Sequence, residues 1–185
     1  MRLYALCDQD LLEKHKLSLE DFVSIAKKYN AEVIQYRNKY SDISFIKQQL
    51  IALRQLFDGF LIVNDIFELT PFCDGVHIGQ EDLKAIDPDM RKAIKILRDV
   101  IGSDKIIGLS THNAQEVQEA NDLDLNYIGL GAYRNSATKN VSSVLGDKLD
   151  QIASLSQHPV AAIGGVRIDD IFQNVTYHVI GSGLL

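Results

Sequence analysis

Short apolar runs alternate along this chain with longer segments whose apolar residues recur at helical spacing. The runs predict eight β-strands, at residues 3–7, 32–36, 60–63, 75–78, 105–109, 127–130, 160–163 and 177–180. The longer segments predict helices at 19–29, 43–57, 89–100, 114–120, 145–155 and 168–172, with a short helical turn at 66–69. The chain is therefore expected to alternate strand and helix along most of its length.

This alternation predicts a parallel sheet, because a helical crossover returns the chain to the same end of the sheet before the next strand begins. The runs at 60–63 and 160–163 are apolar without interruption, which is typical of strands covered on both faces. Eight such units favour an α/β fold closed into a TIM (β/α)8 barrel. A doubly wound open sheet is the structural alternative, but no GxGxxG motif follows the first run. We expect one domain over residues 1–185, lacking the final helix.

Composition narrows the classes of protein to which the chain can belong. It has 185 residues, of which 46% are hydrophobic and 24% charged, enough to form one continuous core. Its net charge of −6 argues against a broad surface for nucleic acid or anionic membranes. The chain holds no apolar stretch of roughly 20 residues, and Asp8 comes too early for a signal peptide. We therefore expect a cytoplasmic protein that binds neither nucleic acid nor membranes, with Cys7 and Cys73 as free thiols.

Polar residues gather where the predicted strands end, which is where parallel barrels carry their active sites. Gln35, Arg37 and Lys39 are spaced by two residues at the end of the second strand, so their side chains point the same way in an extended segment. Arginine offers a planar fork to phosphate oxygens, and lysine offers a compact charge. This spacing indicates a site for phosphate, with a solvated charged loop as the alternative.

Two further segments are suited to binding anions. Ser136, Thr138 and Lys139 supply two hydroxyls and an ammonium group after the sixth strand. Gly165 and Ser182 belong to glycine-rich turns after strands seven and eight, where many barrels bind phosphate through backbone N–H groups. The alternatives are a plain polar loop and tight turns, respectively.

Carboxylates and histidines at the strand ends suggest metal and acid–base chemistry. Asp65 and Asp82 follow neighbouring strands, and such hard ligands beside phosphate donors suit Mg²⁺. His77 and His112 are the acid–base candidates. His77 lies inside an apolar run and is interpreted as a buried, hydrogen-bonded core histidine, whereas His112 at a strand end is more open. We find neither a Ser-His-Asp pattern nor zinc-type spacing.

Several segments together resemble the thiamine phosphate synthase family and its relative, the thiazole tautomerase. They are VIQYRNK (33–39), LIVNDIFEL (61–69), DGVHIGQEDL (74–83), IIGLSTH (106–112), YIGLGAYRNSATK (127–139) and VAAIGGV (160–166). The resemblance covers nearly the whole chain and implies a transferase of thiamine biosynthesis. Such an enzyme joins a pyrimidine diphosphate to a thiazole phosphate and releases diphosphate in a reaction that depends on Mg²⁺.

The resemblance also implies roles for individual residues. Gln35 and Ser110 would contact the pyrimidine. The diphosphate would be held by Arg37, Lys39 and Asn64, and Mg²⁺ by Asp65 and Asp82. The substrate phosphates would be bound by Ser136, Thr138 and Lys139, and the thiazole phosphate by Gly165 and Ser182. The candidate catalytic residues are Lys139, Arg37, Ser110 and His112. We expect the loop at 136–139 to close over the substrates and exclude water.

Three functions follow from these residues. A synthase is favoured by Gln35, Asp65, Asp82 and the paired cations. A thiazole tautomerase, an isomerase, would use His112 and need no metal. A non-catalytic binder of thiamine precursors is suggested only by departures from the family pattern, among them Arg134 in the sixth loop and a short segment at 173–176. Without a final helix, the apolar flank near Ile180, Leu184 and Leu185 predicts a homodimer interface.

Overall fold

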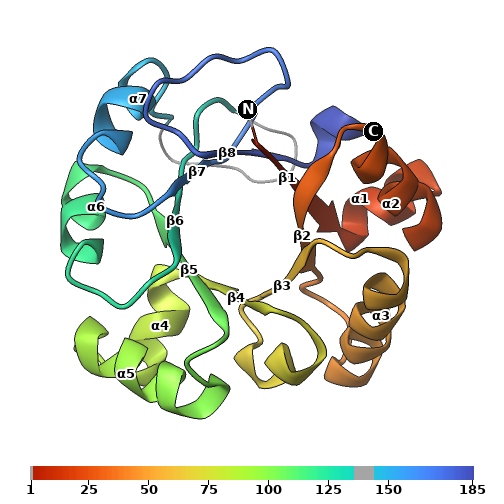
Figure 1. The fold of residues 1–185 in the computed structure, drawn as a ribbon, viewed down its shortest axis with the longest axis horizontal. Coiled ribbons are helices and arrows are strands. Elements are labelled where there is room, and N and C mark those ends of the chain that lie inside the picture. The colour runs from red at the N-terminus through yellow and green to blue at the C-terminus, as the bar shows by residue number, and fades with distance from the viewer. Residues whose placement is uncertain (1, 136–143) are drawn as a thin grey trace.

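Eight parallel strands close into a barrel in the computed structural model, which describes residues 2–135 and 144–185 (Figure 1). The first strand, β1 (Arg2–Asp8), pairs with both β2 (Ala31–Arg37) and β8 (Tyr177–Ile180), and this double pairing closes the sheet. The predicted barrel and its eight strands are confirmed. The strands are β1 (Arg2–Asp8), β2 (Ala31–Arg37), β3 (Phe60–Asn64), β4 (Gly75–Ile78), β5 (Ile106–Thr111), β6 (Tyr127–Leu130), β7 (Val160–Ala162) and β8 (Tyr177–Ile180).

Helices surround the strands on the outside of the barrel (Figure 1). They are α1 (Gln9–His15), α2 (Leu19–Lys28), α3 (Ile43–Leu56), α4 (Gln80–Ile86), α5 (Met90–Ile101), α6 (Ala114–Ala120) and α7 (Lys148–Ala153), with 3₁₀-helices η1 (Phe67–Phe72) and η2 (Ser182–Leu184). Side-chain caps define several starts: Ser18 and Asp21 form a capping box at α2, and Asp42 accepts a hydrogen bond from the backbone N–H of Phe45 at α3.

The sequence pattern missed α1 and α4, and it made α7 too long at both ends. Each missed helix has seven residues, and α4 buries only Leu83. So short a helix shows too little apolar periodicity to be recognised. The start of α1 is instead fixed by Asp8 at the end of β1, whose carboxylate accepts a hydrogen bond from the backbone N–H of Leu11.

The helix predicted at 168–172 is wrong, because this segment forms turns and irregular structure before β8. Its apolar residues do not share a buried face, since Ile171 is 92% exposed. The segment is held in two other ways. The ring of Phe172 packs edge-on against Tyr133 and His178, with centroid distances of 5.0 and 5.1 Å. In addition, the Asp150 carboxylate of α7 accepts hydrogen bonds from the next two backbone N–H groups, at 173 and 174.

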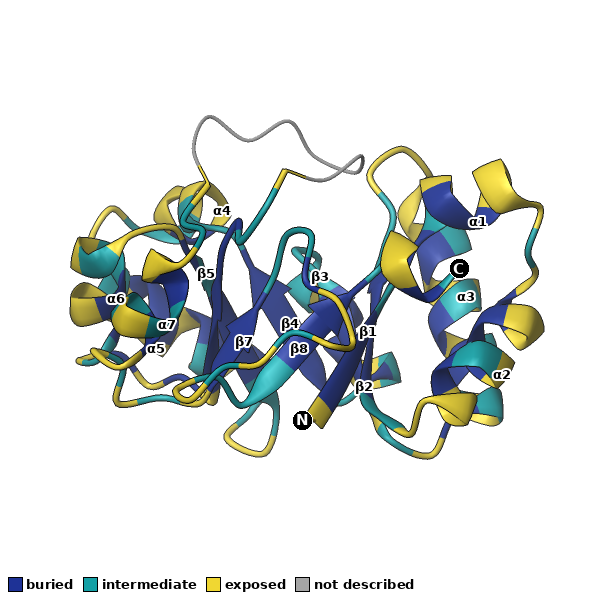
Figure 2. Cartoon of the chain, turned by 90° about the horizontal axis from the view of Figure 1, so that it is seen from above, coloured by how far each residue is buried: buried dark blue, intermediate teal, exposed yellow. Residues whose placement is uncertain are grey.

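The expectation of an uncovered flank at the end of the chain is also wrong. Ile180 and Leu184 are only 1% and 7% exposed. The chain end lies beside α1 in both views (Figures 1 and 2), and Leu11 of that helix approaches Gly181. The unpredicted helix α1 is thus next to the space that we expected to be open. As predicted, Cys7 and Cys73 are free thiols.

Two apolar cores flank the strands, which are largely buried in Figure 2. The larger core lies between the strands and the helices, whereas the smaller one fills the barrel with Tyr4, Val33, Ile62, Tyr127, Ala161 and Val179. Glycines make room for the rings inside. A Cβ atom on Gly108 would overlap the ring of Tyr127, and one on Gly129 would lie 2.9 Å from Cε1 of His77. Among the described residues, no helix is long and apolar enough to cross a membrane.

Gly108→Ala is expected to lower the free energy of unfolding by about 1–3 kcal/mol, because the added methyl group collides with the Tyr127 ring. Denaturant unfolding measures this loss. In a Tyr127→Ala background the collision is absent, so the same substitution should add little further cost. An equal decrease in the free energy of unfolding in the two backgrounds would show that the Tyr127 ring is not the reason why glycine is needed at position 108.

Candidate active site

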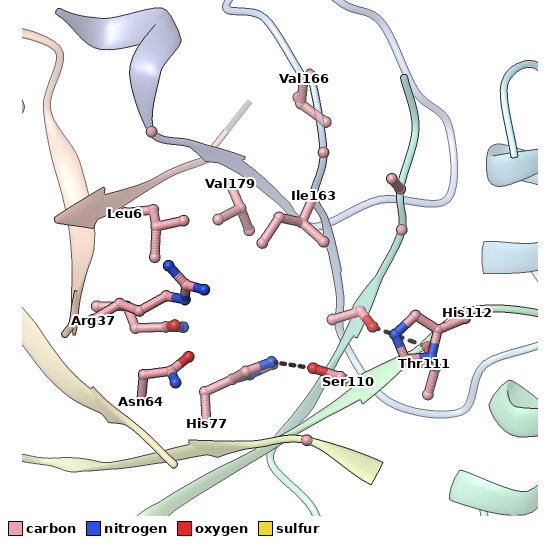
Figure 3. A pocket seen from close by; sticks show the side chains of 18 of the residues that line it. Leu6, Arg37, Asn64, His77, Ser110, Thr111, His112, Ile163, Val166 and Val179 are labelled. Atoms are coloured by element: carbon pink, nitrogen blue, oxygen red, sulfur yellow. Dashed lines mark hydrogen bonds between the residues drawn. The ribbon is translucent and has the colours of Figure 1, made fainter. Parts of the chain in front are cut away.

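A pocket of about 950 Å³ opens at the carboxyl ends of the strands. Residues on or just after each of the eight strands contribute to it, and Figure 3 shows part of its lining. The predicted site residues that the structure describes all line this one pocket: Gln35, Arg37, Lys39, Asn64, Asp65, Asp82, Ser110, His112, Gly165 and Ser182. The other three, Ser136, Thr138 and Lys139, lie outside the described residues. Nothing in the structure therefore bears on the expected closure of their loop.

The cationic side of the pocket contains a charge pair that the sequence pattern did not reveal. Arg37 forms an ion pair with Asp8, whose side chain is only 2% exposed. The other carboxylate oxygen of Asp8 caps α1, so the carboxylate is held from two sides. The guanidinium is thereby fixed at the pocket wall, whereas Lys39 is exposed. Asp8 could have been found from sequence, since it too is the last residue of a strand.

The two predicted metal ligands come together beside Gly79. A Cβ atom on this glycine would lie 2.7 Å from Oδ2 of Asp82 and 4.0 Å from Oδ1 of Asp65. Asp65 has a left-handed backbone with φ of +62°, and its Oδ1 accepts a hydrogen bond from the Gly79 backbone N–H at 3.3 Å. Its backbone N–H donates to the carbonyl oxygen of His77 at 2.8 Å, which holds this conformation in place.

Electrostatics at this carboxylate pair favours a cation. Burial raises the pKa of Asp65, and the nearby charge of Asp82 raises it further. A divalent cation would relieve that repulsion. Within the described ranges, no group of three His, Cys, Asp or Glu residues could hold a metal ion. Two carboxylates in an open pocket fit Mg²⁺, which completes its shell with water and substrate phosphates, better than they fit a zinc site.

His77 lies on the pocket floor, and its interpretation as a buried, hydrogen-bonded histidine is confirmed. Its Nδ1 is 2.9 Å from the hydroxyl oxygen of Tyr127, and its Nε2 is 2.9 Å from Oγ of Ser110 (Figure 3 shows the second contact). Burial lowers the pKa of His77 to about 4, so the ring is neutral at pH 7. The hydroxyl of Tyr127 in turn contacts that of Tyr4.

His112 lies at the edge of the same pocket, where it is more exposed than His77. Its Nδ1 is 2.8 Å from Oε2 of Glu116, and the same carboxylate accepts a hydrogen bond from the His112 backbone N–H. Glu116, on α6, therefore sets the orientation of the ring. The expectation that His112 is the more open of the two histidines is confirmed.

The turn after β7 requires glycine at two consecutive positions. Gly164 and Gly165 have φ values of +87° and +65°. Arg134 clamps this turn: its Nη1 donates to the carbonyl oxygen of Gly165 at 3.0 Å, and its fork binds both carboxylate oxygens of Asp170 at 2.7 Å. Arg134 is one of the departures from the family pattern noted above, and the structure shows what it does. Its partner Asp170 was not predicted.

The sequence pattern of the thiamine monophosphate synthase family matches residues 3–182. The chain belongs to this family. A thiamine-phosphate synthase of Persephonella marina is 33% identical over 173 residues, covering 90% of this chain and 78% of the relative. One of Vibrio campbellii is 33% identical over 181 residues, covering 93% and 82%. The solved structure of thiamine phosphate pyrophosphorylase from Pyrococcus furiosus matches with a TM-score of 0.76 at 26% identity, covering 98% of this chain and 85% of that one.

Membership of the family assigns a transferase activity in thiamine biosynthesis, the synthesis of thiamine phosphate. The isomerase and the non-catalytic binder are not favoured by these relatives. The resemblance found in the sequence is thus confirmed.

Because His77 is neutral when folded, acidification should destabilise the protein through this residue. The pKa of His77 falls from its ordinary value of 6.5 to about 4, so between these pH values the unfolded chain binds a proton that the folded chain does not. The free energy of unfolding should therefore decrease as pH falls through this window, by up to roughly 3 kcal/mol from this one group. Denaturant titrations of wild type and His77→Gln at pH 7 and 4.5 measure the difference. Equal losses in the two proteins would contradict the assignment.

Proposed function

We propose that this pocket joins an aminopyrimidine diphosphate to a thiazole phosphate, with release of diphosphate and with Mg²⁺ as the metal. One observation carries the proposal: a single pocket combines the carboxylates of Asp65 and Asp82, the cations of Arg37 and Lys39, and the glycine turn after β7. The first two groups suit a metal-bound diphosphate, and the turn suits a second phosphate.

The diphosphate end of the reaction lies over β2, β3 and β4. Asp65 and Asp82 would hold Mg²⁺, which when bound would neutralise charge on the departing diphosphate. Arg37, Lys39 and Asn64 would bind the diphosphate oxygens directly. Arg37 uses Nη1 for Asp8, which leaves other N–H groups of its planar fork for phosphate. The ion pair with Asp8 orients the guanidinium before the substrate arrives, which favours binding.

The chemistry needs no nucleophilic side chain. The bond between the pyrimidine methylene carbon and the diphosphate oxygen breaks, and its electron pair leaves with the diphosphate. The lone pair of the thiazole nitrogen then forms the new C–N bond. A cationic carbon must be kept from water in the interval, and Leu6, Ile163 and Val179 provide an apolar wall in the pocket (Figure 3).

The thiazole phosphate would bind at the glycine turn and η2. The backbone of Gly165 lines the pocket without a side chain in the way, and Ser182 adds a hydroxyl. Lys139, with Ser136 and Thr138, keeps its predicted role as a binder of substrate phosphates. His112 has no necessary step in this reaction, because no proton transfer at a ring carbon is required.

A cytoplasmic location and a homodimer stay predictions. The second no longer has the support of an uncovered flank at Ile180 and Leu184, because both are buried within the chain.

Replacing one proposed metal ligand should nearly abolish synthesis. With the pyrimidine diphosphate, the thiazole phosphate and Mg²⁺ supplied, we expect Asp65→Asn to lower kcat/KM by roughly 100-fold or more, because the metal loses one of its two carboxylates. Asp58→Asn changes an exposed carboxylate outside the pocket and serves as the control. An unaffected Asp65→Asn enzyme would contradict the metal assignment. If wild type forms no thiamine phosphate but aromatises the carboxylated thiazole phosphate without metal, the synthase proposal is lost.

Arg134→Ala should weaken binding of the thiazole phosphate but not of the pyrimidine diphosphate. It removes the hydrogen bond to the Gly165 carbonyl oxygen and the fork to Asp170, so the turn is no longer held in its binding conformation. We expect the KM for the thiazole phosphate to rise about tenfold, equivalent to roughly one hydrogen bond. The KM for the pyrimidine diphosphate should change little. Steady-state kinetics with each substrate varied in turn measures both values, and an equal rise in the two would refute a local role.

A further inference from the structure

A chain of hydrogen bonds crosses the barrel interior beneath the pocket and joins two residues of its floor. It begins at Gln35 on β2, whose Nε2 donates to the hydroxyl oxygen of Tyr4 on β1 at 2.6 Å. The Tyr4 hydroxyl is 2.8 Å from that of Tyr127 on β6. From Tyr127 the chain passes to Nδ1 of His77 on β4 and from Nε2 of His77 to Oγ of Ser110 on β5, each step being 2.9 Å.

The middle of this chain is shielded from solvent. Tyr4 and Tyr127 are 1% and 6% exposed, and they pack in the apolar interior cluster. Gln35, His77 and Ser110 line the pocket, whereas the two tyrosines lie below it. A buried hydroxyl hydrogen must be donated to a neighbour, because leaving it unpaired is costly. Each hydroxyl in the middle of the chain can therefore donate only along the chain.

The direction of donation follows from the first member. The Gln35 amide nitrogen can only donate, so the Tyr4 oxygen accepts from it. The hydrogen of Tyr4 is then donated to Tyr127, and the hydrogen of Tyr127 to Nδ1 of His77. A neutral imidazole that accepts at Nδ1 carries its hydrogen on Nε2, which donates to Ser110. All four hydrogen bonds between the five residues are thus donated in the same direction, from Gln35 on β2 towards Ser110 on β5.

This direction determines what the two ends present to a ligand. Nε2 of Gln35 uses one hydrogen for Tyr4 and keeps the other, beside Oε1, which makes no hydrogen bond to the described part of the chain. The free edge of the amide thus offers an acceptor and a donor side by side. This pair matches an amino group next to an unprotonated ring nitrogen, as when glutamine reads adenine. Ser110 accepts from His77 and so keeps its own hydrogen to donate into the pocket.

We propose that Tyr4, Tyr127 and His77 are positioning residues that fix the polarity of Gln35 and Ser110, and that this polarity selects a 4-aminopyrimidine over its 4-oxo counterpart. The inference rests on the proposed function for the reaction in which the selection is measured. A 4-oxo ring presents an acceptor beside a ring N–H, which is the reverse of the amino pattern. Facing Gln35 in this orientation, it would pair acceptor with acceptor and donor with donor.

Variants that each lack one hydroxyl group of this hydrogen-bond chain test the proposal. For the wild type we expect kcat/KM for the 4-aminopyrimidine diphosphate to exceed that for the 4-oxo analogue by at least about 100-fold. In Tyr4→Phe and in Tyr127→Phe this ratio should fall about tenfold or more, because the polarity is no longer imposed along the chain. The KM for the aminopyrimidine diphosphate should rise, whereas the KM for the thiazole phosphate should stay the same. The double variant should be no worse than the poorer single variant.

Tyr36→Phe is the matched control. Tyr36 is as deeply buried as Tyr4. Its hydroxyl, however, donates to Oε1 of Gln9 at 2.8 Å and takes no part in the hydrogen-bond chain from Gln35 to Ser110. This variant should keep the wild-type ratio. If the ratio is unchanged in Tyr4→Phe while thiamine phosphate still forms, the inference is overturned and the proposed function stands. An equal loss of selectivity in Tyr36→Phe would also overturn it, since the effect would then be one of general packing.

The imidazole tautomer provides a readout that needs no activity. In ¹⁵N NMR of labelled protein, with the resonances of His77 assigned by comparison with His77→Gln, we expect the neutral form with its hydrogen on Nε2. Tyr127→Phe should increase the share with the hydrogen on Nδ1. Wild-type protein protonated on Nδ1 would reverse the chain and overturn the inference. If no thiamine phosphate forms at all, the proposed function fails, and equilibrium dialysis of the two pyrimidine diphosphates still measures the selection.

Discussion

The interior of a closed barrel of eight strands must be filled by the side chains that point inward, and in this protein several of those side chains are polar. Two tyrosines and a histidine occupy part of this space. Aliphatic side chains in their place would have no polar atoms that need a hydrogen-bond partner. Because each polar atom needs a partner, the rings are locked to one another and to the strands on opposite sides of the barrel. The floor of the pocket is therefore continuous with the packed interior of the barrel.

The same constraint determines some of the backbone. Gly108 and Gly129 have no side chain because the rings of Tyr127 and His77 occupy that volume. The carboxylate pair depends on a different local feature, the left-handed backbone of Asp65, which aspartate tolerates better than most residues do. The geometry of the pocket thus depends on positions where only certain residue types fit, such as glycine at 108 and 129 and aspartate at 65.

The barrel and most of the described site could be predicted from the sequence, because strand periodicity and strand-end position depend on nearest neighbours along the chain. Gln35, Asp65 and Asp82 were found in this way. The residues that escaped prediction act through contacts between distant segments. Tyr4 and Tyr127 read as ordinary apolar strand residues, and only barrel closure brings them together. Asp170 is separated from Arg134 by 36 positions, so nothing local marked it as a partner.

The failed helix at 168–172 has the same origin. A local pattern indicated a helix, but Asp170 caps the turn from within by accepting a hydrogen bond from the Arg167 backbone N–H at 2.7 Å, while its carboxylate also binds Arg134. Tertiary contacts therefore outweigh a weak local preference over a segment this short.

Asp8 has a consequence for how this enzyme could change over generations. One of its oxygens holds the start of the first helix, and the other holds Arg37 at the pocket wall. Under the proposed function, a replacement of Asp8 would affect both the start of α1 and the binding of the diphosphate by Arg37, so selection cannot adjust one property at this position without disturbing the other. Substrate preference would instead have to evolve at positions such as Lys39, whose side chain is exposed and makes no hydrogen bond or ion pair with the described residues. A residue that makes two such contacts thus leaves sequence variation to other positions of the pocket.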